Sequence, residues 1–247
     1  MSAALLVTGG AKRLGAAIAR RLAADGYRVV IHFRRSAAEA AETASMIGAQ
    51  AVCGDLSDPA AVRDIFAAAQ RLAGGRIDGV VNSASRFDYD RPEAFDPALL
   101  QSLVATNVSA PVLLATELAG QPDLADGVVI NLLDQKLANP NPDFFSYTLT
   151  KTALEGATTM LAQALAPRIR VNAVAPGLTL PSGSQTPEEF EQVARRNLLE
   201  RPVGAESVAD AVAWLVGARS VTGQTVFVDS GQRFVKSERD VMFDRER

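Results

Sequence analysis

Short, mostly apolar runs alternate with longer amphipathic stretches along almost the whole chain, and this alternation limits the possible folds more than any other feature. Runs such as Ala3–Val7, Gly127–Leu133 and Ile169–Ala175 are apolar at nearly consecutive positions. Strands of this kind are covered on both faces, which is typical of parallel sheets. Because parallel strands need crossover helices, the pattern predicts one doubly wound α/β domain, which we place over residues 1–235. The other expected strands are Tyr27–Phe33, Ala49–Cys53, Ile77–Val81 and Thr225–Val228, and the expected helices are Arg13–Asp25, Ala37–Ile47, Ala60–Ala73, Ala98–Leu118, Tyr147–Leu165 and Ser207–Val216.

Composition excludes several classes of function. The 247 residues are 48% hydrophobic and 21% charged, as in a globular chain that can bury a large core. A formal net charge of −3 offers no basic field to a nucleic acid. One cysteine, Cys53, and one histidine, His32, leave little room for a metal site, and we expect none. Without a secretory signal or a run near the roughly 18 apolar residues of a membrane span, we expect a cytoplasmic protein with no membrane or nucleic-acid partner.

Two stretches interrupt the alternation. The segment Pro176–Pro187 is rich in Pro, Ser, Gly and Thr, and predicts a loop that leads into a helix at Glu188–Leu198. Loops of this length in compact domains are often lids or binding loops. The C-terminal tail, residues 236–247, has 8 charged residues among 12. It is either a solvated end or an ordered arm that packs on its own or another subunit.

The segment Thr8–Gly15 (TGGAKRLG) lies where the first strand ends and the first helix begins. Glycines at such a turn let backbone N–H groups approach a pyrophosphate, and the helix N-terminus favours the anion. A glycine cluster alone can be only a tight turn, but between a buried strand and an amphipathic helix it indicates dinucleotide binding. Arg13 places a cation where a middle glycine is usual. The candidate cofactor contacts in this turn are Gly9, Lys12, Arg13 and Leu14.

The residues after the second strand indicate which dinucleotide is bound. An NAD enzyme usually has Asp or Glu here, to hold the ribose 2′-hydroxyl group. This chain has Arg34, Arg35 and Ser36 instead, and guanidinium groups match a 2′-phosphate in charge and geometry. The alternative is that both arginines are surface charges. We favour NADP(H) as the cofactor.

Residues after the third and fourth strands complete the expected cofactor site. Asp55, which Leu56 follows, either accepts a hydrogen bond from the adenine amino group or serves only as a turn residue. The short side chains of Asn82, Ser83 and Ala84 would permit close approach of the cofactor.

Tyr147 and Lys151 lie four residues apart in a helical stretch, so the phenol and the ammonium group share one face. A free tyrosine titrates near about 10, which is too high for proton transfer at neutral pH. Lys151 and the positive nicotinamide ring would lower the pKa of Tyr147 and let the pair act as a general acid toward a hydride acceptor. Such pairs occur on many helices, and the position after the fifth strand of a dinucleotide-binding sheet favours catalysis here.

Over residues 3–232 the chain resembles the short-chain dehydrogenase/reductase family. The resemblance rests on the TGGAKRLG turn, the Asn82–Ala84 segment, Asn107, the Tyr147 and Lys151 pair, and Pro176 with Gly177. It implies a Rossmann-type sheet of strand order 3-2-1-4-5-6-7 and an NAD(P)-dependent reductase that forms a homotetramer or homodimer. It also implies cofactor contacts at Lys151, Pro176 and Gly177. Asn107 would complete a proton relay with Tyr147 and Lys151.

One departure from the family pattern narrows the class. Most members have a serine thirteen residues before the catalytic tyrosine, whereas this chain has Asp134. Pteridine reductases within the family look similar here, and also at Arg13, at the basic segment His32–Ser36, and in a Ser-x-Phe at Ser85 and Phe87. By this resemblance Phe87 stacks on a flat heterocycle, and Ser85 and Arg13 bind its polar edge.

The resemblance further implies that Asp134 and Tyr147 supply protons. Reducing a C=N bond needs a proton on nitrogen, and a carboxyl group can relay one or pair with an aminopyrimidine edge as a hydroxyl cannot. Two alternatives stay open, because Phe87 can belong to the core and Asp134 can be a helix cap.

Three functions follow from these residues. The first is an NADPH-dependent reductase that transfers hydride to a C=N bond of a pterin-like substrate, of dihydropterin or dihydrofolate type. The second is a carbonyl reductase of the same family, acting on a ketone. The third is a non-catalytic dinucleotide sensor, against which the set of Asn107, Tyr147 and Lys151 argues.

Overall fold

A seven-stranded sheet, in which every neighbouring pair is parallel, runs through the part of the chain that the structure describes. This computed structural model describes residues 2–181, 186–241 and 243. The strands are β1 (Ala4–Thr8), β2 (Arg28–Phe33), β3 (Gln50–Cys53), β4 (Gly79–Asn82), β5 (Gly127–Leu132), β6 (Ile169–Pro176) and β7 (Thr225–Val228). Their order is 3-2-1-4-5-6-7. The doubly wound fold predicted from the sequence is confirmed.

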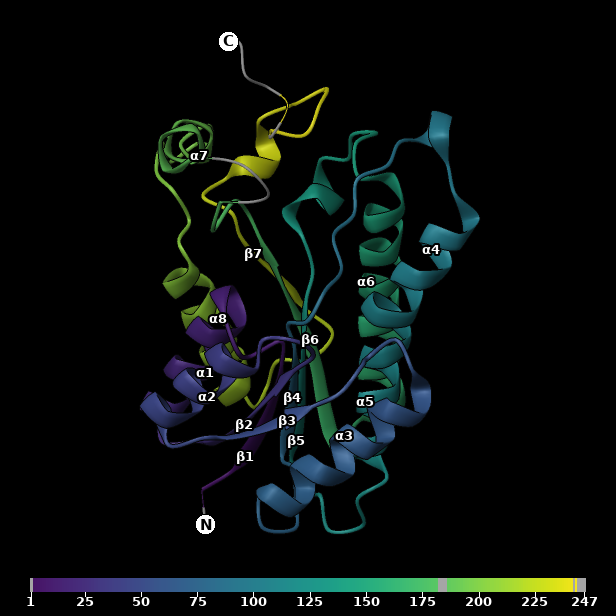
Figure 1. The fold of residues 1–247 in the computed structure, drawn as a ribbon, viewed down its shortest axis with the longest axis vertical. Helices are drawn as coiled ribbons and strands as arrows, with labels where there is room; N and C mark the ends of the chain where they lie inside the picture. The colour runs from purple at the N-terminus through teal and green to yellow at the C-terminus, as the bar shows by residue number, and fades with distance from the viewer. Residues whose placement is uncertain (1, 182–185, 242, 244–247) are drawn as a thin grey trace.

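Helices cover both faces of the sheet (Figure 1). On one side lie α1 (Arg13–Ala24), α2 (Ala37–Ile47) and α8 (Ala205–Gly217), and on the other lie α3 (Pro59–Leu72), α4 (Pro97–Val104), α5 (Ala110–Ala119) and α6 (Phe145–Leu165). Along β1, Leu5 and Val7 pack into the core with α1 and α8, whereas Ala4 and Leu6 pack into the core with α3 and α5. Burial on both faces explains why the strand is apolar at consecutive positions.

The helix expected at Ala98–Leu118 is interrupted by one wider turn. The π turn η2 (Ala105–Ser109) joins α4 to α5 within a continuous helical run. Among the described residues, Pro97–Ala119 is the one helix long and apolar enough to cross a membrane by length and composition, contrary to the expectation that no stretch comes near this limit. Its Leu103 and Leu114 are fully buried, and 39% of its most apolar window is buried inside the protein, so this one helix does not by itself indicate a membrane span.

The helix expected at Glu188–Leu198 is shorter than predicted. It is α7 (Pro187–Ala194), and it begins with a capping box in which Thr186 and Glu189 exchange side-chain to backbone hydrogen bonds. The Asn197 amide ends it, because it donates to the carbonyl oxygen of Ala194 and accepts from two backbone N–H groups further on. Part of the loop expected before this helix, residues 182–185, lies outside the described residues.

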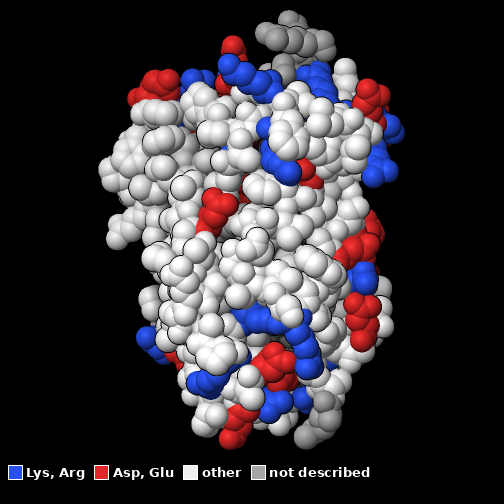
Figure 2. Space-filling view, turned by 180° about the vertical axis from the view of Figure 1, so that it is seen from behind, with Lys and Arg blue, Asp and Glu red and all other residues white. Residues whose placement is uncertain are grey.

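The connections at the carboxyl edge of the sheet carry short turns. These 3₁₀ turns are η1 (Pro92–Ala94), η3 (Gln135–Ala138) and η4 (Gln232–Phe234). Because all strands point the same way, the segments after β1, β4, β5, β6 and β7 meet at this edge. Figure 2 shows that Lys and Arg lie among Asp and Glu toward both ends of the visible face, whereas its middle is mostly uncharged.

Candidate active site

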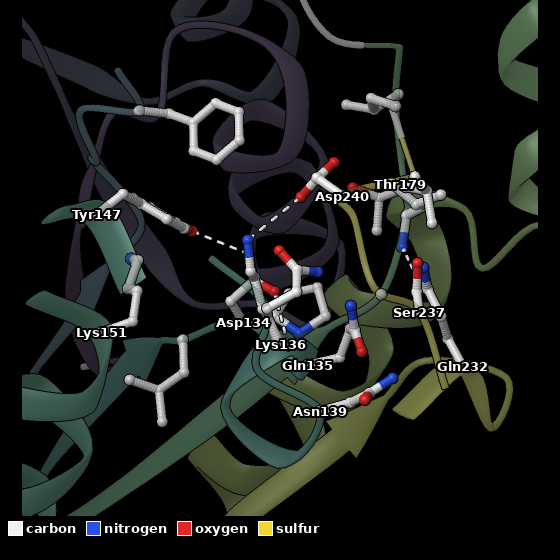
Figure 3. Close-up of a pocket in the computed structure, with 18 of the residues that line it drawn as sticks. Asp134, Gln135, Lys136, Asn139, Tyr147, Lys151, Thr179, Gln232, Ser237 and Asp240 are labelled. Carbon is white, nitrogen blue, oxygen red and sulfur yellow. Dashed lines mark hydrogen bonds and ion pairs between the residues drawn. The ribbon is translucent and has the colours of Figure 1, made fainter. Parts of the chain in front are cut away.

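A cavity of about 490 Å³ opens at the carboxyl edge of the sheet. The end of β5 and helix α6 form one side of it, with Tyr147 and Lys151 (Figure 3). Thr179 from the loop after β6, and Ser237 from the tail, lie on the opposite side. The structure therefore brings residues from four distant parts of the sequence around one space.

Tyr147 and Lys151 lie one turn apart on α6, and both are buried. The Lys151 ammonium group donates to the carbonyl oxygen of Leu132 (2.7 Å) and lies 5.5 Å from the centre of the Tyr147 ring. Burial lowers the pKa of Lys151 to about 8. Burial also raises the pKa of Tyr147 well above its usual value, and the Asp134 carboxylate adds to that rise. In this structure burial and Asp134 raise the pKa of Tyr147, and the expectation that Lys151 together with a bound nicotinamide ring lowers it stays a prediction.

Asp134 caps a turn and also contacts Tyr147, and its role in supplying protons stays a prediction. One carboxylate oxygen accepts from the backbone N–H of Lys136 (2.9 Å) and caps the 3₁₀ turn η3. The other accepts from the Tyr147 hydroxyl (3.0 Å). Burial raises the pKa of Asp134 against the lowering effect of these two hydrogen bonds. Burial thus shifts both the phenol and the carboxyl group toward their protonated forms.

Asn107 lies in the π turn and connects the loop after β4 to α6. Its side chain accepts from the backbone N–H of Arg86 (2.8 Å) and donates to the carbonyl oxygen of the same residue (3.0 Å). It also donates to the Thr150 hydroxyl (3.1 Å), next to Lys151. The structure therefore shows Asn107 as a clamp between two elements, and its role in a proton relay stays a prediction.

Phe87 is 44% exposed, so the interpretation of this residue as part of the core is wrong. Its ring stacks on Phe144 at 4.0 Å between centroids and meets the Tyr147 ring edge-on at 4.7 Å. Phe144 immediately precedes α6 with a φ of 51°, in the left-handed region, and sequence reasoning missed it. Ser85, two residues earlier, lies with its hydroxyl 3.3 Å from the Asn107 amide oxygen. Both Ser85 and Phe87 line the cavity.

A second cavity, of about 430 Å³, lies beside the glycine turn. Most of the predicted cofactor contacts line it: Gly9, Lys12, Arg13, Leu14, Arg34, Arg35, Ser36, Asp55, Leu56, Ser83 and Ala84. Lys151, Pro176 and Gly177 line the first cavity instead. Asn82 is buried beneath both, where its amide donates to the side chain of Asn131 (2.8 Å).

The backbone beside this second cavity leaves room for a ligand. Gly9 has a φ of 65°, which favours glycine, and a Cβ added at Gly15 would clash with the Gly9 carbonyl group. The buried hydroxyl of Thr106 lines the cavity without a hydrogen-bond partner in the described part of the chain. With the guanidinium groups of Arg34 and Arg35 at its rim, the cavity fits a dinucleotide that carries an extra phosphate.

Asp55 acts as a turn residue in this structure. One of its oxygens accepts from the backbone N–H (2.9 Å) and the hydroxyl (2.7 Å) of Ser57, and the other pairs with Arg34 at 2.7 Å. Burial tends to raise the pKa of Asp55, but the Ser57 hydrogen bonds and the charge of Arg34 lower it below its usual value. A contact with adenine stays a prediction.

Arg13 lies between the two cavities and lines both. Its guanidinium group donates to the carbonyl oxygen of Pro181 (2.7 Å), so it ties the glycine turn to the loop after β6. Its backbone φ is 54°, in the left-handed region. Its predicted contacts with both cofactor and substrate stay predictions.

His32 supports the glycine turn from below, a role that sequence reasoning did not assign. The buried ring accepts from the Gly9 N–H through Nδ1 (3.3 Å) and lies 3.1 Å from the Gly54 carbonyl oxygen through Nε2. Burial lowers the pKa of His32, which favours the neutral ring with its proton on Nε2. The sequence signal for this role was the presence of a polar residue, His32, in a mostly apolar strand.

The described residues of the tail pack against their own chain. Asp143 is fully buried and accepts from the Arg239 guanidinium group (2.7 Å) and from the Asp240 N–H (2.8 Å). Asp240 also pairs with the buried ammonium group of Lys136 at 3.5 Å. Burial acts to raise the pKa of Asp143, but these donors lower it below its usual value. The tail is therefore an ordered arm over residues 236–241 and 243.

A protein-family model described as enoyl-(acyl carrier protein) reductase matches residues 9–233. Pteridine reductase 1 of Leishmania tarentolae is 32% identical, covering 94% of this chain and 96% of its own. The chain is 36% identical to 3beta-hydroxysteroid dehydrogenase 1 of Eggerthella lenta, covering 92% of each. The protein belongs to the short-chain dehydrogenase/reductase family and is an oxidoreductase of that family.

Among solved structures, the chain is similar to FolM alternative dihydrofolate reductase 1 from Brucella canis, crystallised in complex with NADP. The two chains are 43% identical, the TM-score is 0.89, and each is covered over 96% of its length. The resemblance to pteridine reductases within the family is confirmed by these two relatives.

Proposed function

We propose that this protein is an NADPH-dependent reductase that transfers hydride to a C=N bond of a pterin-like substrate. The observation that carries the proposal is the hydrogen bond between Asp134 and Tyr147 in a cavity that Phe87 also lines. A carboxyl group can pair with an aminopyrimidine edge, and an exposed aromatic ring can stack on a flat heterocycle.

The choice of NADPH rests on the cationic rim of the second cavity. Arg34 and Arg35 occupy the place where an NAD enzyme carries an acidic residue, and Ser36 follows them. The NADP in the Brucella structure agrees with this choice. Changing Arg34 to Asp together with Arg35 to Ala is expected to weaken NADPH binding far more than NADH binding. Equal losses would contradict the assignment.

NADPH, when bound, supplies the hydride that the carbon of the C=N bond receives. The nitrogen then takes a proton, and the Tyr147 hydroxyl and the Asp134 carboxyl group are the donors that the cavity offers. Burial raises the pKa of each group, which shifts both toward their protonated forms. The Lys151 ammonium group, held on the Leu132 carbonyl oxygen, supports negative charge that develops beside it.

A second candidate is reduction of a ketone by the same residues. Tyr147 and Lys151 are sufficient for protonating a carbonyl oxygen, and the similarity to a hydroxysteroid dehydrogenase supports this candidate. The two functions differ in how strongly each activity is expected to depend on Asp134. An Asp134→Ser variant is expected to lose turnover of dihydropterins and to keep or gain turnover of ketones if the first function is correct. Unchanged dihydropterin turnover would show that dihydropterin reduction does not depend on Asp134.

We also propose that the protein is a homo-oligomer, either a tetramer or a dimer. Large apolar side chains are exposed on its helices, including Leu149 and Met160 of α6 and Trp214 of α8. Surfaces of this kind are typical of subunit interfaces. Light scattering coupled to gel filtration tests this directly, and a monomeric mass would contradict it.

A further inference from the structure

Cationic side chains predominate around the first cavity, although the chain as a whole carries a formal net charge of −3. The charged residues that line it are Arg13, Lys136, Lys151, Arg196, Lys236 and Arg239 on the basic side, and Asp134 and Asp240 on the acidic side. A cavity with this balance attracts anions. NADPH accounts for positive charge beside the glycine turn, but not for positive charge on the opposite wall.

Most of the cations on that wall already have partners. Lys136 pairs with Asp240, and Arg239 pairs with the buried carboxylate of Asp143. Lys236 differs, because it is exposed and has no carboxylate within ion-pair distance among residues 2–181, 186–241 and 243. It lines the cavity from the tail, beside Ser237.

The segment that carries Lys236 is held in place from both sides. On one side, the Asn139 amide donates to the carbonyl oxygen of Val235 (2.7 Å). On the other side, Asp143 binds both Arg239 and the backbone of Asp240. Anchors immediately before and shortly after Lys236 fix its backbone on the wall, which lowers the entropic cost of binding a ligand there.

The wall lies across the cavity from the groups that would bind the reacting ring. Figure 3 shows Tyr147 and Lys151 on one side, with Thr179, Gln232 and Ser237 on the other. At about 490 Å³, the cavity falls in the range of roughly 300–1,000 Å³ that is typical of sites for drug-sized ligands. A ring stacked on Phe87 beside the catalytic pair therefore leaves space for a substituent that extends toward Lys236.

We propose that Lys236 is a specificity-determining residue that binds a carboxylate on the substituent of the substrate. This inference rests on the proposed function and deepens it. The substrate class becomes dihydropterins that carry an acidic substituent, such as the aminobenzoyl-glutamate group of dihydrofolate, in preference to dihydropterins with a neutral side chain.

The test compares two substrates that share the ring, dihydrofolate and dihydrobiopterin, with NADPH in excess. Lys236→Gln is expected to raise the KM for dihydrofolate about fivefold, in the range of a partly exposed ion pair, and to leave the KM for dihydrobiopterin unchanged. Lys236→Arg keeps the positive charge, so its KM for dihydrofolate is expected to equal that of the wild type. Added salt is expected to raise the KM for dihydrofolate in the wild type but not in Lys236→Gln.

Glu238→Gln is the matched control, because it changes the charge of the same segment at a residue outside the cavity lining. It is expected to leave both KM values unchanged. Equal effects of Lys236→Gln on the two substrates, or no effect on either, would overturn the inference. Turnover of dihydrobiopterin without turnover of dihydrofolate would overturn the inference and leave the proposed function standing. Turnover of neither substrate would overturn the inference, and if dihydromonapterin is not turned over either, the proposed function falls with it.

Discussion

A carboxyl group buried against a phenol holds its proton more tightly than it does in water, and Asp134 is such a group. Its pKa is raised by burial, and the Tyr147 hydroxyl donates to it at 3.0 Å. The protonated acid can donate to a substrate nitrogen, and the carboxylate cannot.

We therefore expect kcat/KM for a dihydropterin to fall as pH rises through the raised pKa of Asp134. Asp134→Asn keeps a side-chain oxygen for the Lys136 N–H but has no titrating proton. Its kcat/KM is therefore expected to be low at every pH and to show no such fall. The pH–rate profiles of both proteins provide the measurement. The same alkaline fall in Asp134→Asn would show that another group is responsible.

The same shift has a consequence for stability. A raised folded-state pKa means that the stability contributed by the protonated acid is fully present below the unfolded pKa of about 3.9 and is lost as pH rises through the folded pKa. The Tm of Asp134→Asn relative to that of the wild type should therefore rise as pH rises. A constant difference between their Tm values would contradict the shift.

Lys151 provides a second titration at the residue scale. Its pKa is lowered to about 8, so the ammonium form that can bind an anionic or polar ligand is lost as pH rises through that value. We expect NADPH binding to weaken at least about tenfold above this pH, as for loss of a charge-assisted hydrogen bond. Calorimetric titration with NADPH at several pH values measures this change in affinity. Lys151→Arg does not titrate in this range and is expected to lack the step, and a step that persists in this variant would contradict the assignment.

At the scale of elements, the π turn between α4 and α5 presents Asn107 to the loop after β4. Asn107→Ala leaves the backbone N–H and carbonyl groups of Arg86 without these partners, at a cost of about 1–3 kcal/mol in the free energy of unfolding. Urea denaturation measures the change. Ser102→Ala is the matched control, because it removes a contact to the Arg86 side chain rather than its backbone. If Asn107→Ala lowered the free energy of unfolding no more than Ser102→Ala does, the role of Asn107 as a clamp between the two elements would be contradicted.

The elements show where sequence reasoning succeeds and where it fails. The strands and the Tyr147 and Lys151 pair could be predicted because burial and helical spacing leave local patterns. The π turn leaves no local pattern in the sequence, since its wider geometry depends on packing against neighbouring elements. The same holds for Phe144, whose left-handed backbone and contact with Phe87 depend on residues far apart in the sequence.

At the scale of the whole molecule, distant segments meet in ways that no local pattern encodes. The tail reaches the cavity because Asp143, nearly a hundred residues earlier in the chain, binds Arg239 and the Asp240 backbone. The sequence left open whether this tail is solvated or ordered, since a run of charges suits both. The buried carboxylate of Asp143 holds the tail in an ordered arrangement.

NADPH oxidation by the purified protein measures the proposed reaction itself. The substrates are dihydrobiopterin, dihydromonapterin and dihydrofolate, set beside a panel of ketones and quinones. We predict turnover of at least one dihydropterin, which Tyr147→Phe reduces at least about 10²-fold because the general acid is lost. Turnover of ketones alone would contradict the pterin assignment, while full activity of Tyr147→Phe would contradict the mechanism.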